Sequence, residues 1–151
     1  MLLEEALAER ADALDLLKKR QFWLRQLVKI NEGDEVVEDP YKLIREQYQT
    51  LDRLLALDKQ IHKTNTKTML QDNQSLLSAV IRLRIMMKKR RLYSITAERA
   101  SDSERRYSRN QVKYFTIFNI AELHNKAEQV DRDYQKLAAM IQKRSWETKL
   151  L

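Results

Sequence analysis

The sequence has no cysteine and only one glycine and one proline in its 151 residues. Without cysteine, disulfides, thiolate zinc sites, iron–sulfur clusters and cysteine nucleophiles are excluded. One glycine cannot supply a Gly-rich phosphate-binding loop, and one glycine with one proline cannot supply the many tight turns of a β-sandwich or barrel. What remains is a mostly helical protein that is long enough to bury one core.

Long apolar runs are also missing. No stretch approaches the roughly 18 apolar residues of a membrane-spanning helix. The first residues, Met1 to Glu5, lack the basic region and the apolar core of a secretory signal. We therefore expect a cytoplasmic protein with no membrane partner, and the absence of cysteine fits that compartment.

Charge is abundant but unevenly distributed. The chain has 29 Lys+Arg and 22 Asp+Glu, a formal net charge of +7. Residues 82–113 contain eleven cations and three acids, whereas residues 31–40 contain five acids and no cation. A basic zone and an acidic segment attract anions or a second copy of the same chain.

Hydrophobic periodicity predicts four helices in a single helical domain that spans residues 1–151. Their expected ranges are 2–30, 40–63, 75–100 and 119–145. Asp39 before Pro40, and later Ser75 and Asn119, are suitable N-cap residues. Helices of this length pack at small crossing angles, so we expect an all-α fold: an elongated four-helix bundle, or long antiparallel hairpins of coiled-coil character.

Apolar residues recur at heptad-like spacing within these ranges. The expected stripe of the first helix is Leu3, Leu7, Arg10, Leu14, Leu17, Gln21, Leu24 and Val28, widened by Ala6, Ala13 and Leu27. That of the second is Tyr41, Ile44, Tyr48, Leu51, Leu54, Leu55 and Ile61. The third has Leu76, Val80, Leu83 and Met87, with Ala79, Met86 and Tyr93 beside them. The fourth has Ile120, Leu123, Ala127, Val130, Tyr134, Leu137 and Ile141.

One segment departs from the helical pattern. Residues 112–118 (VKYFTIF) are β-branched and aromatic, which predicts a short strand or an extended segment. Both of its sides would be apolar, and the chain offers no second strand to pair with it. The segment must therefore be covered, either by its own bundle, if the polar loop 101–111 folds it back over the helices, or by another chain. In the second case the candidate contacts to a second copy are Val112, Tyr114, Phe115, Ile117 and Phe118.

Four segments resemble a single family. They are residues 64–67 (TNTK), 105–115 (RRYSRNQVKYF), 119–123 (NIAEL) and 141–150 (IQKRSWETKL). The family consists of small, uncharacterised bacterial helical proteins, some of which carry the name septicolysin. The resemblance implies an all-helical oligomeric protein and brings no established activity.

Nothing in the residue pattern indicates catalysis, a metal or another cofactor. The two histidines, His62 and His124, each have a carboxylate four residues away, Asp58 and Glu128, so that each pair shares a helix face. Two such pairs in a bundle core could bind a divalent metal, but this spacing recurs by chance in charged helices. We therefore expect that the protein has no metal site, no cofactor and no small-molecule substrate, and that it is not an enzyme.

Two functional hypotheses remain. The first is a self-assembling structural or interaction protein, because polar residues on the apolar stripes can fix register and oligomeric state. These residues are Arg10, Gln21, Asp58 and Arg90. The second is nucleic-acid binding by the zone 82–113, because cations neutralise phosphates and aromatic rings stack on unpaired bases. Its candidate contacts are Lys88, Lys89, Arg90, Arg91, Arg105, Arg106, Arg109 and Lys113.

Overall fold

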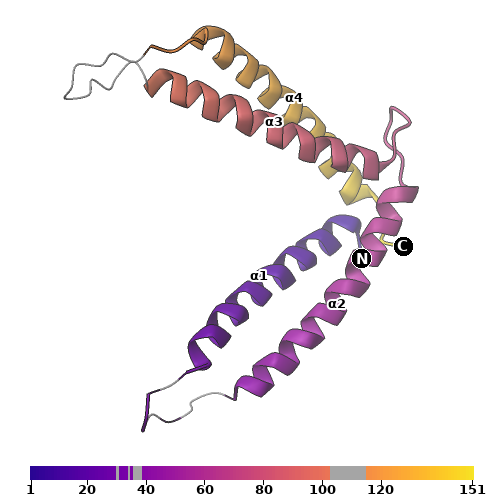
Figure 1. Ribbon diagram of the computed structural model, residues 1–151. Coiled ribbons are helices and arrows are strands. Elements are labelled where there is room, and N and C mark those ends of the chain that lie inside the picture. The colour runs from indigo at the N-terminus through magenta and orange to yellow at the C-terminus, as the bar shows by residue number, and fades with distance from the viewer. Residues whose placement is uncertain (30, 34, 36–38, 103–114) are drawn as a thin grey trace, which may run out of the picture. The chain divides into compact units, whose positions relative to one another are not determined.

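The computed structural model describes all residues except 30, 34, 36–38 and 103–114. The described residues form four helices and no sheet, so the all-α prediction is confirmed (Figure 1). The helices are α1 (Leu3–Leu27), α2 (Pro40–Lys67), α3 (Leu76–Asp102) and α4 (Ile120–Glu147). At about 1.5 Å per residue, each is about 40 Å long.

The expected N-caps are present. The Asp39 carboxylate accepts a hydrogen bond from the amide of Tyr41 at 2.9 Å, and Pro40 occupies the first helical position, where no amide is needed. The Ser75 hydroxyl and the Asn119 side-chain oxygen each accept from the amide three residues on, at 3.2 and 3.1 Å. Three of the four helices therefore begin where local chemistry satisfies their free amides.

The second helix is longer than predicted. It continues through residues 64–67, beyond the expected end at residue 63. Thr64 and Asn65 are buried there, and the Thr64 hydroxyl donates to the carbonyl of Gln60 at 2.8 Å. Burial of this side of the helix outweighs the weak helix propensity of Thr and Asn.

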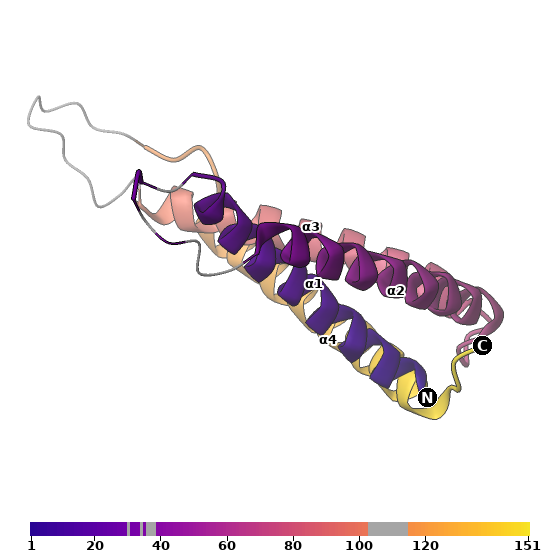
Figure 2. The same cartoon turned by 90° about the horizontal axis from the view of Figure 1, so that it is seen from below.

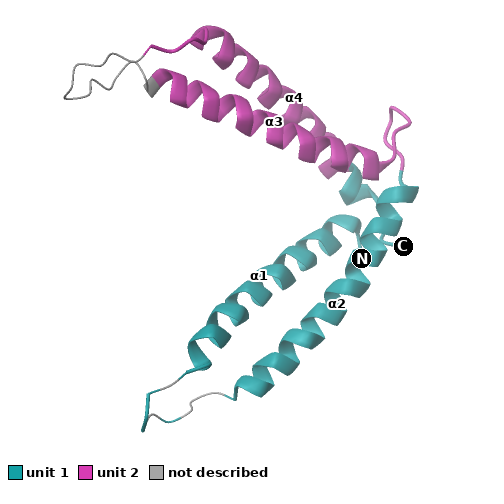
Figure 3. Cartoon of the chain, in the orientation of Figure 1, with its two compact units in different colours: residues 1–68, 144–151 teal, residues 69–143 magenta. Residues whose placement is uncertain are grey.

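Two compact units make up the chain (Figure 3). Unit 1 comprises residues 1–68 and 144–151, and unit 2 comprises residues 69–143. Each unit is built on a helical hairpin, as predicted. The prediction of one domain over residues 1–151 stays a prediction.

In unit 1, α1 and α2 are antiparallel and share one apolar seam. The seam residues of α1 that are buried or half-buried are Leu3, Ala6, Arg10, Ala13, Leu17, Arg20, Leu24 and Leu27. Those of α2 are Leu43, Gln47, Thr50, Leu54, Leu57, Ile61 and Thr64. Both sets step by three and four residues, which is the spacing of coiled-coil contacts.

The stripe predicted for the first helix is therefore confirmed in part. Leu3, Arg10, Leu17 and Leu24 do lie on the seam, but Leu14 and Val28 are exposed. The places of Leu14 and Val28 on the seam are taken by Ala13 and Leu27, one position earlier, which the sequence predicted only as residues that widen the stripe. Small side chains let two helices approach closely, whereas the sequence shows apolar residues at both sets of positions and does not distinguish them.

Polar residues fix the register of this hairpin. Arg10 pairs with Asp58 at 2.6 Å, and Arg20 pairs with Glu46 at 3.0 Å. Arg20 also donates to the Thr50 hydroxyl at 3.0 Å. Because each arginine lies on the seam, a shift of α1 along α2 would break these pairs.

The last residues of the chain close unit 1 at the end where α1 begins. The amide of Leu3 donates to the carbonyl of Thr148 at 2.8 Å, and the amide of Leu150 donates to that of Met1 at 3.1 Å. The amide of Leu151 donates to the Thr64 hydroxyl at 3.0 Å. Residues 148–151 thus join the start of α1 to the end of α2.

In unit 2, α3 and α4 lie side by side and antiparallel in both views (Figures 1 and 2). The α4 stripe is the one predicted: all seven of its members are half-buried or buried. Opposite it, α3 contributes Leu76, Ala79, Leu83, Met86, Tyr93, Ala97 and Ala100. The core of unit 2 therefore lies between these two helices.

Candidate functional site

The four consecutive cations of α3 point in different directions around the helix axis. Lys88, Lys89, Arg90 and Arg91 are all exposed. Arg90 alone lies on the seam, where its guanidinium pairs with Asp131 of α4 at 2.5 Å and lies 5.5 Å from the ring centre of Tyr134. The other candidate nucleic-acid contacts, Arg105, Arg106, Arg109 and Lys113, lie outside the described residues.

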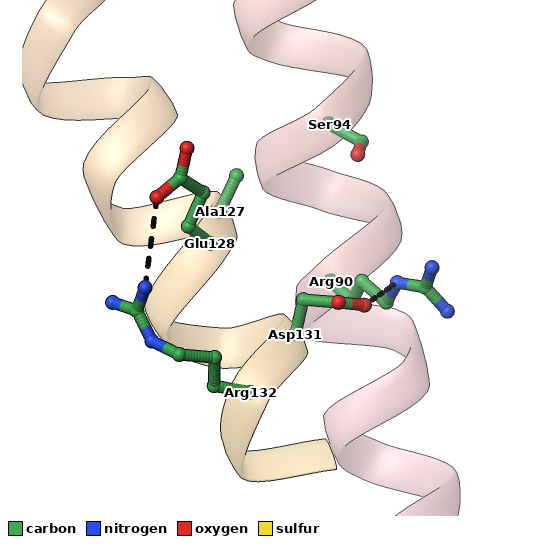
Figure 4. Close-up of a pocket in the computed structure, with 6 residues that line it drawn as sticks. All are labelled: Arg90, Ser94, Ala127, Glu128, Asp131 and Arg132. Carbon is green, nitrogen blue, oxygen red and sulfur yellow. Dashed lines mark ion pairs between the residues drawn. The ribbon is translucent and has the colours of Figure 1, made fainter. Parts of the chain in front are cut away.

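A shallow pocket of about 370 Å³ surrounds the Arg90–Asp131 pair (Figure 4). A second ion pair, between Arg132 and Glu128 at 3.6 Å, lies on the α4 side of this pocket. Both cations of the pocket are thus paired with carboxylates, and Ser94 lies apart from the two pairs. A serine nucleophile needs a neighbouring base within hydrogen-bond reach, and this pocket gives Ser94 none among the residues that line it.

Two surface ion pairs perturb the groups that form them. On α4, the Lys126 ammonium hydrogen-bonds to Glu122 and lowers the pKa of that carboxyl. On α1, Lys19 lowers the pKa of Asp15 in the same way. Both pairs span one helical turn in open solvent, which is the pattern of ordinary helix stabilisation and not of a catalytic pair.

The histidine pairs do not form a metal centre in the part of the chain that the structure describes. No three His, Asp or Glu side chains gather there. Both His62 and His124 are exposed, and the Asp58 carboxylate is engaged with Arg10. The ion pair with Arg10 explains why an acidic residue, Asp58, occurs in an otherwise apolar stripe.

The sequence predicted a short strand or an extended segment at 112–118, and the strand prediction is wrong for the described part. Residues 115–118 form no strand; the chain bends, and the Thr116 hydroxyl accepts from the amide of Phe118 at 3.2 Å. This turn leads directly to the N-cap of α4, so capping takes precedence over the β propensity of the side chains. Val112 and Tyr114 lie outside the described residues.

The apolar side chains of this turn are nevertheless exposed, as an interaction surface requires. Phe115 is 82% exposed and Ile117 is 94% exposed. With Phe118 and the end of α3, they border an open depression of about 420 Å³. Its α3 wall is formed by Ile95, Thr96, Arg99 and Ala100.

A second exposed apolar surface lies on α2. We call it the α2 outer stripe: Tyr41, Ile44, Tyr48, Leu51 and Leu55, which are between 40% and 71% exposed. Their spacing of three and four residues matches that of the seam, from which they are displaced by about 100° around the helix. The sequence detected this stripe but combined it with Leu54 and Ile61, which face α1.

The comparisons with known proteins concern the whole chain. The family model DUF6847, described as a family of unknown function, matches residues 4–150. The chain belongs to this family. None of the curated proteins matches it.

A solved structure resembles the chain along its full length. It is described as the crystal structure of a functionally unknown conserved protein from Corynebacterium diphtheriae. The two chains are 31% identical with a TM-score of 0.85, and the match covers 100% of this chain and 99% of the other. Neither description mentions septicolysin, so the family resemblance is confirmed only as far as a bacterial protein of unknown function.

Nothing in the family or in this neighbour indicates catalysis. Within the described residues, no helix has both the length and the apolar character needed to cross a bilayer. What the structure does offer is interaction surface: the α2 outer stripe in unit 1, and the depression with the cations of α3 in unit 2.

Proposed function

We propose that the protein is a helical scaffold that self-associates through the α2 outer stripe. The observation that carries this proposal is the exposed heptad spacing of Tyr41, Ile44, Tyr48, Leu51 and Leu55. A seam of this spacing is used within unit 1 to pack α2 against α1. The second seam, on the same helix, has the geometry to pack against another helix in the same way.

The charge distribution supports this choice of surface. Of the 29 Lys+Arg and 22 Asp+Glu, 14 cations and 14 acids belong to unit 1. Unit 1 therefore has no net charge, and two copies that associate through it are not repelled by like net charge. Five large apolar side chains in one line also exceed the scattered single exposures that are usual on a monomer.

The experiment compares the oligomeric mass of matched double variants by sedimentation equilibrium. Tyr48→Ser with Leu51→Ser removes the centre of the stripe without adding charge. Leu16→Ser with Phe22→Ser removes two comparably exposed apolar side chains of α1 that lie outside the stripe. We expect an oligomer for the wild type and the α1 variant, and a monomer with unchanged helix content for the stripe variant.

A wild-type chain that sediments as a monomer up to high micromolar concentration would overturn the proposal. Equal loss of mass in both variants would also overturn it, because the contact would then be general apolar adhesion. The hypothesis of nucleic-acid binding by residues 82–113 stays a prediction. An absorbance ratio at 260 and 280 nm that falls after a high-salt wash would support it, since phosphate contacts are salt-sensitive.

A further inference from the structure

All of the net charge of the chain belongs to unit 2. This unit has 15 Lys+Arg and 8 Asp+Glu, a formal +7, whereas unit 1 is neutral. Six cations of α3 form no ion pair with any described residue: Arg82, Arg84, Lys88, Lys89, Arg91 and Arg99. Glu98 is the one acidic side chain of α3 that the structure describes. This helix therefore presents a strong positive field that its own unit does not neutralise.

Apolar side chains lie among these cations. Ile81, Ile85, Leu92 and Ile95 are each about half exposed or more, on the side of α3 turned away from its seam with α4. Lys88 lies in the same line, and Arg84 and Arg91 flank it one helical turn away on either side. At about 1.5 Å per residue, the line from Ile81 to Ile95 is about 21 Å long.

The line ends at the depression beside the turn 115–118. Ile95 and Arg99 form part of its wall, and Phe115 and Ile117 project from its rim with almost their full surface exposed. The combined surface, which we call the α3 face, thus has an aliphatic and aromatic centre with cations around it. Its charge requires an anionic partner, and its centre requires that partner to accept apolar side chains.

We propose that the α3 face binds the surface of an anionic lipid bilayer. Lipid phosphates would pair with the cations, and Phe115, Ile117 and the α3 aliphatic side chains would enter the boundary between headgroups and acyl chains. Branched aliphatic side chains contribute free energy there, whereas they stack poorly on nucleic-acid bases. A second copy fits less well, because two α3 faces in contact would oppose six cations with six cations.

The inference differs from the sequence-based expectation that no membrane partner is involved. That expectation rested on the absence of a spanning segment, and no described helix does span a bilayer. A peripheral contact has other requirements: exposed apolar side chains and nearby cations, with no minimum run of apolar residues. The sequence has these residues, but only the fold brings the turn 115–118 against the end of α3.

The test is co-sedimentation of the full chain with lipid vesicles. One set of vesicles is phosphatidylcholine alone, and the other is phosphatidylcholine with an equal part of phosphatidylglycerol. We expect binding to the second set only, weakened by added salt. Replacing Arg84, Lys88 and Arg91 with Gln should lower the partition coefficient about a hundredfold, and Phe115→Ser with Ile117→Ser about tenfold or more.

Matched controls lie in unit 1. Gln at Lys18, Arg25 and Lys29 removes the same amount of charge from exposed positions outside the face, and Val28→Ser removes an exposed apolar side chain. Both should bind vesicles as the wild type does. Because these variants leave the α2 outer stripe intact, their sedimentation mass reports separately on self-association.

Three results would overturn the inference. The first is equal binding to neutral and anionic vesicles, and the second is equal loss in the control variants. The third is absence of vesicle binding by a wild-type chain that binds single-stranded oligothymidylate, which would assign the cations to nucleic acid. A Phe115 and Ile117 double variant that lost oligomeric mass and kept vesicle binding would also overturn the inference, because the turn would then be a contact between copies, as the sequence predicted.

Discussion

At the scale of single residues, polar side chains on the seams between helices stabilise this fold. Thr64 is fully buried, and its hydroxyl is both donor and acceptor: it donates to the carbonyl of Gln60 and accepts from the amide of Leu151. The seam arginines act similarly, since Arg10 and Arg90 each reach a carboxylate on the neighbouring helix. A buried donor or acceptor that loses its partner costs more free energy than the hydrogen bond itself contributes.

Replacing Thr64 with Val tests this role. Valine keeps the shape and the β-branching but leaves the amide of Leu151 without its acceptor. We expect the free energy of unfolding to fall by about 1–3 kcal/mol, measured by urea denaturation. Thr66→Val is the control, because Thr66 makes the same helical hydrogen bond, to His62, while exposed to solvent. Equal effects of the two substitutions would contradict a special role for Thr64.

The Arg90–Asp131 pair allows a second test at this scale. Both side chains are about two fifths exposed, so solvent screens their attraction. We expect Asp131→Asn to lower the free energy of unfolding by only about 0.5–1 kcal/mol. Asp133→Asn, on the exposed side of the same helix, should have no measurable effect. A double-mutant cycle with Arg90→Gln that shows no coupling would mean that the pair does not fix the register of the hairpin.

At the scale of elements, each hairpin uses one side of its helices and leaves another apolar side open. On α2, Leu57 is 6% exposed and Leu55 is 55% exposed, although they are two residues apart. The first contributes to the seam with α1, and the second belongs to the α2 outer stripe. On α1 and α3, apolar residues likewise occur on more than one side of the helix. This pattern is typical of helices that pack against a neighbour on each of those sides.

The two leucines therefore predict different outcomes for the same substitution. Leu57→Ala should lower the free energy of unfolding by about 2–4 kcal/mol, because it leaves a cavity in the seam. Leu55→Ala should change the stability of the monomer little and should raise the dissociation constant of the oligomer. Urea denaturation at low concentration and sedimentation at several concentrations measure the two effects. A large loss of monomer stability for Leu55→Ala would place that residue in a core.

The start of α2 gives a prediction about capping. Asp39→Ala removes the acceptor for the amide of Tyr41 and should cost about 1 kcal/mol of stability. Asp39→Asn keeps an acceptor oxygen and should restore most of that loss. Thermal unfolding followed by circular dichroism measures both. If Asn and Ala behaved alike, the charge of Asp39 rather than its hydrogen bond would stabilise the helix.

At the scale of the whole molecule, charge and apolar surface are divided between the two units. Unit 1 is neutral and carries the α2 outer stripe, whereas unit 2 carries the full net charge and the α3 face. Two kinds of contact can therefore form on separate units of the chain. Self-association through a neutral surface is weakly dependent on salt, and binding of an anionic partner is strongly dependent on it.

This division predicts how stability depends on conditions. If copies associate through unit 1, the midpoint of thermal unfolding should rise with protein concentration, because assembly stabilises the folded state. The Tyr48 and Leu51 double variant should lose that dependence. A midpoint that is independent of concentration for the wild type would show that the folded chain is stable by itself and does not assemble.

Sequence alone was sufficient for features that depend on neighbouring residues. The four helices, the N-caps Asp39, Ser75 and Asn119, and the stripe of α4 follow from propensity, capping and a single clear heptad pattern. It also marked Arg10, Asp58 and Arg90 as polar residues on apolar seams, and was wrong for Gln21, which is exposed. It did not pair Arg90 with Asp131, because the partner is 41 positions away and has no local signal.

What only the tertiary structure decided is which apolar side faces which neighbour. The first two helices have apolar residues at adjacent positions of the heptad, and local pattern gives both sets equal weight. The choice of Ala13 over Leu14, and of Leu27 over Val28, depends on how closely α2 can approach. The extension of α2 through Thr64, and the turn that replaces a strand at 115–118, have the same origin. Burial and capping by distant or competing groups outweigh intrinsic propensities of a few tenths of a kcal/mol per residue.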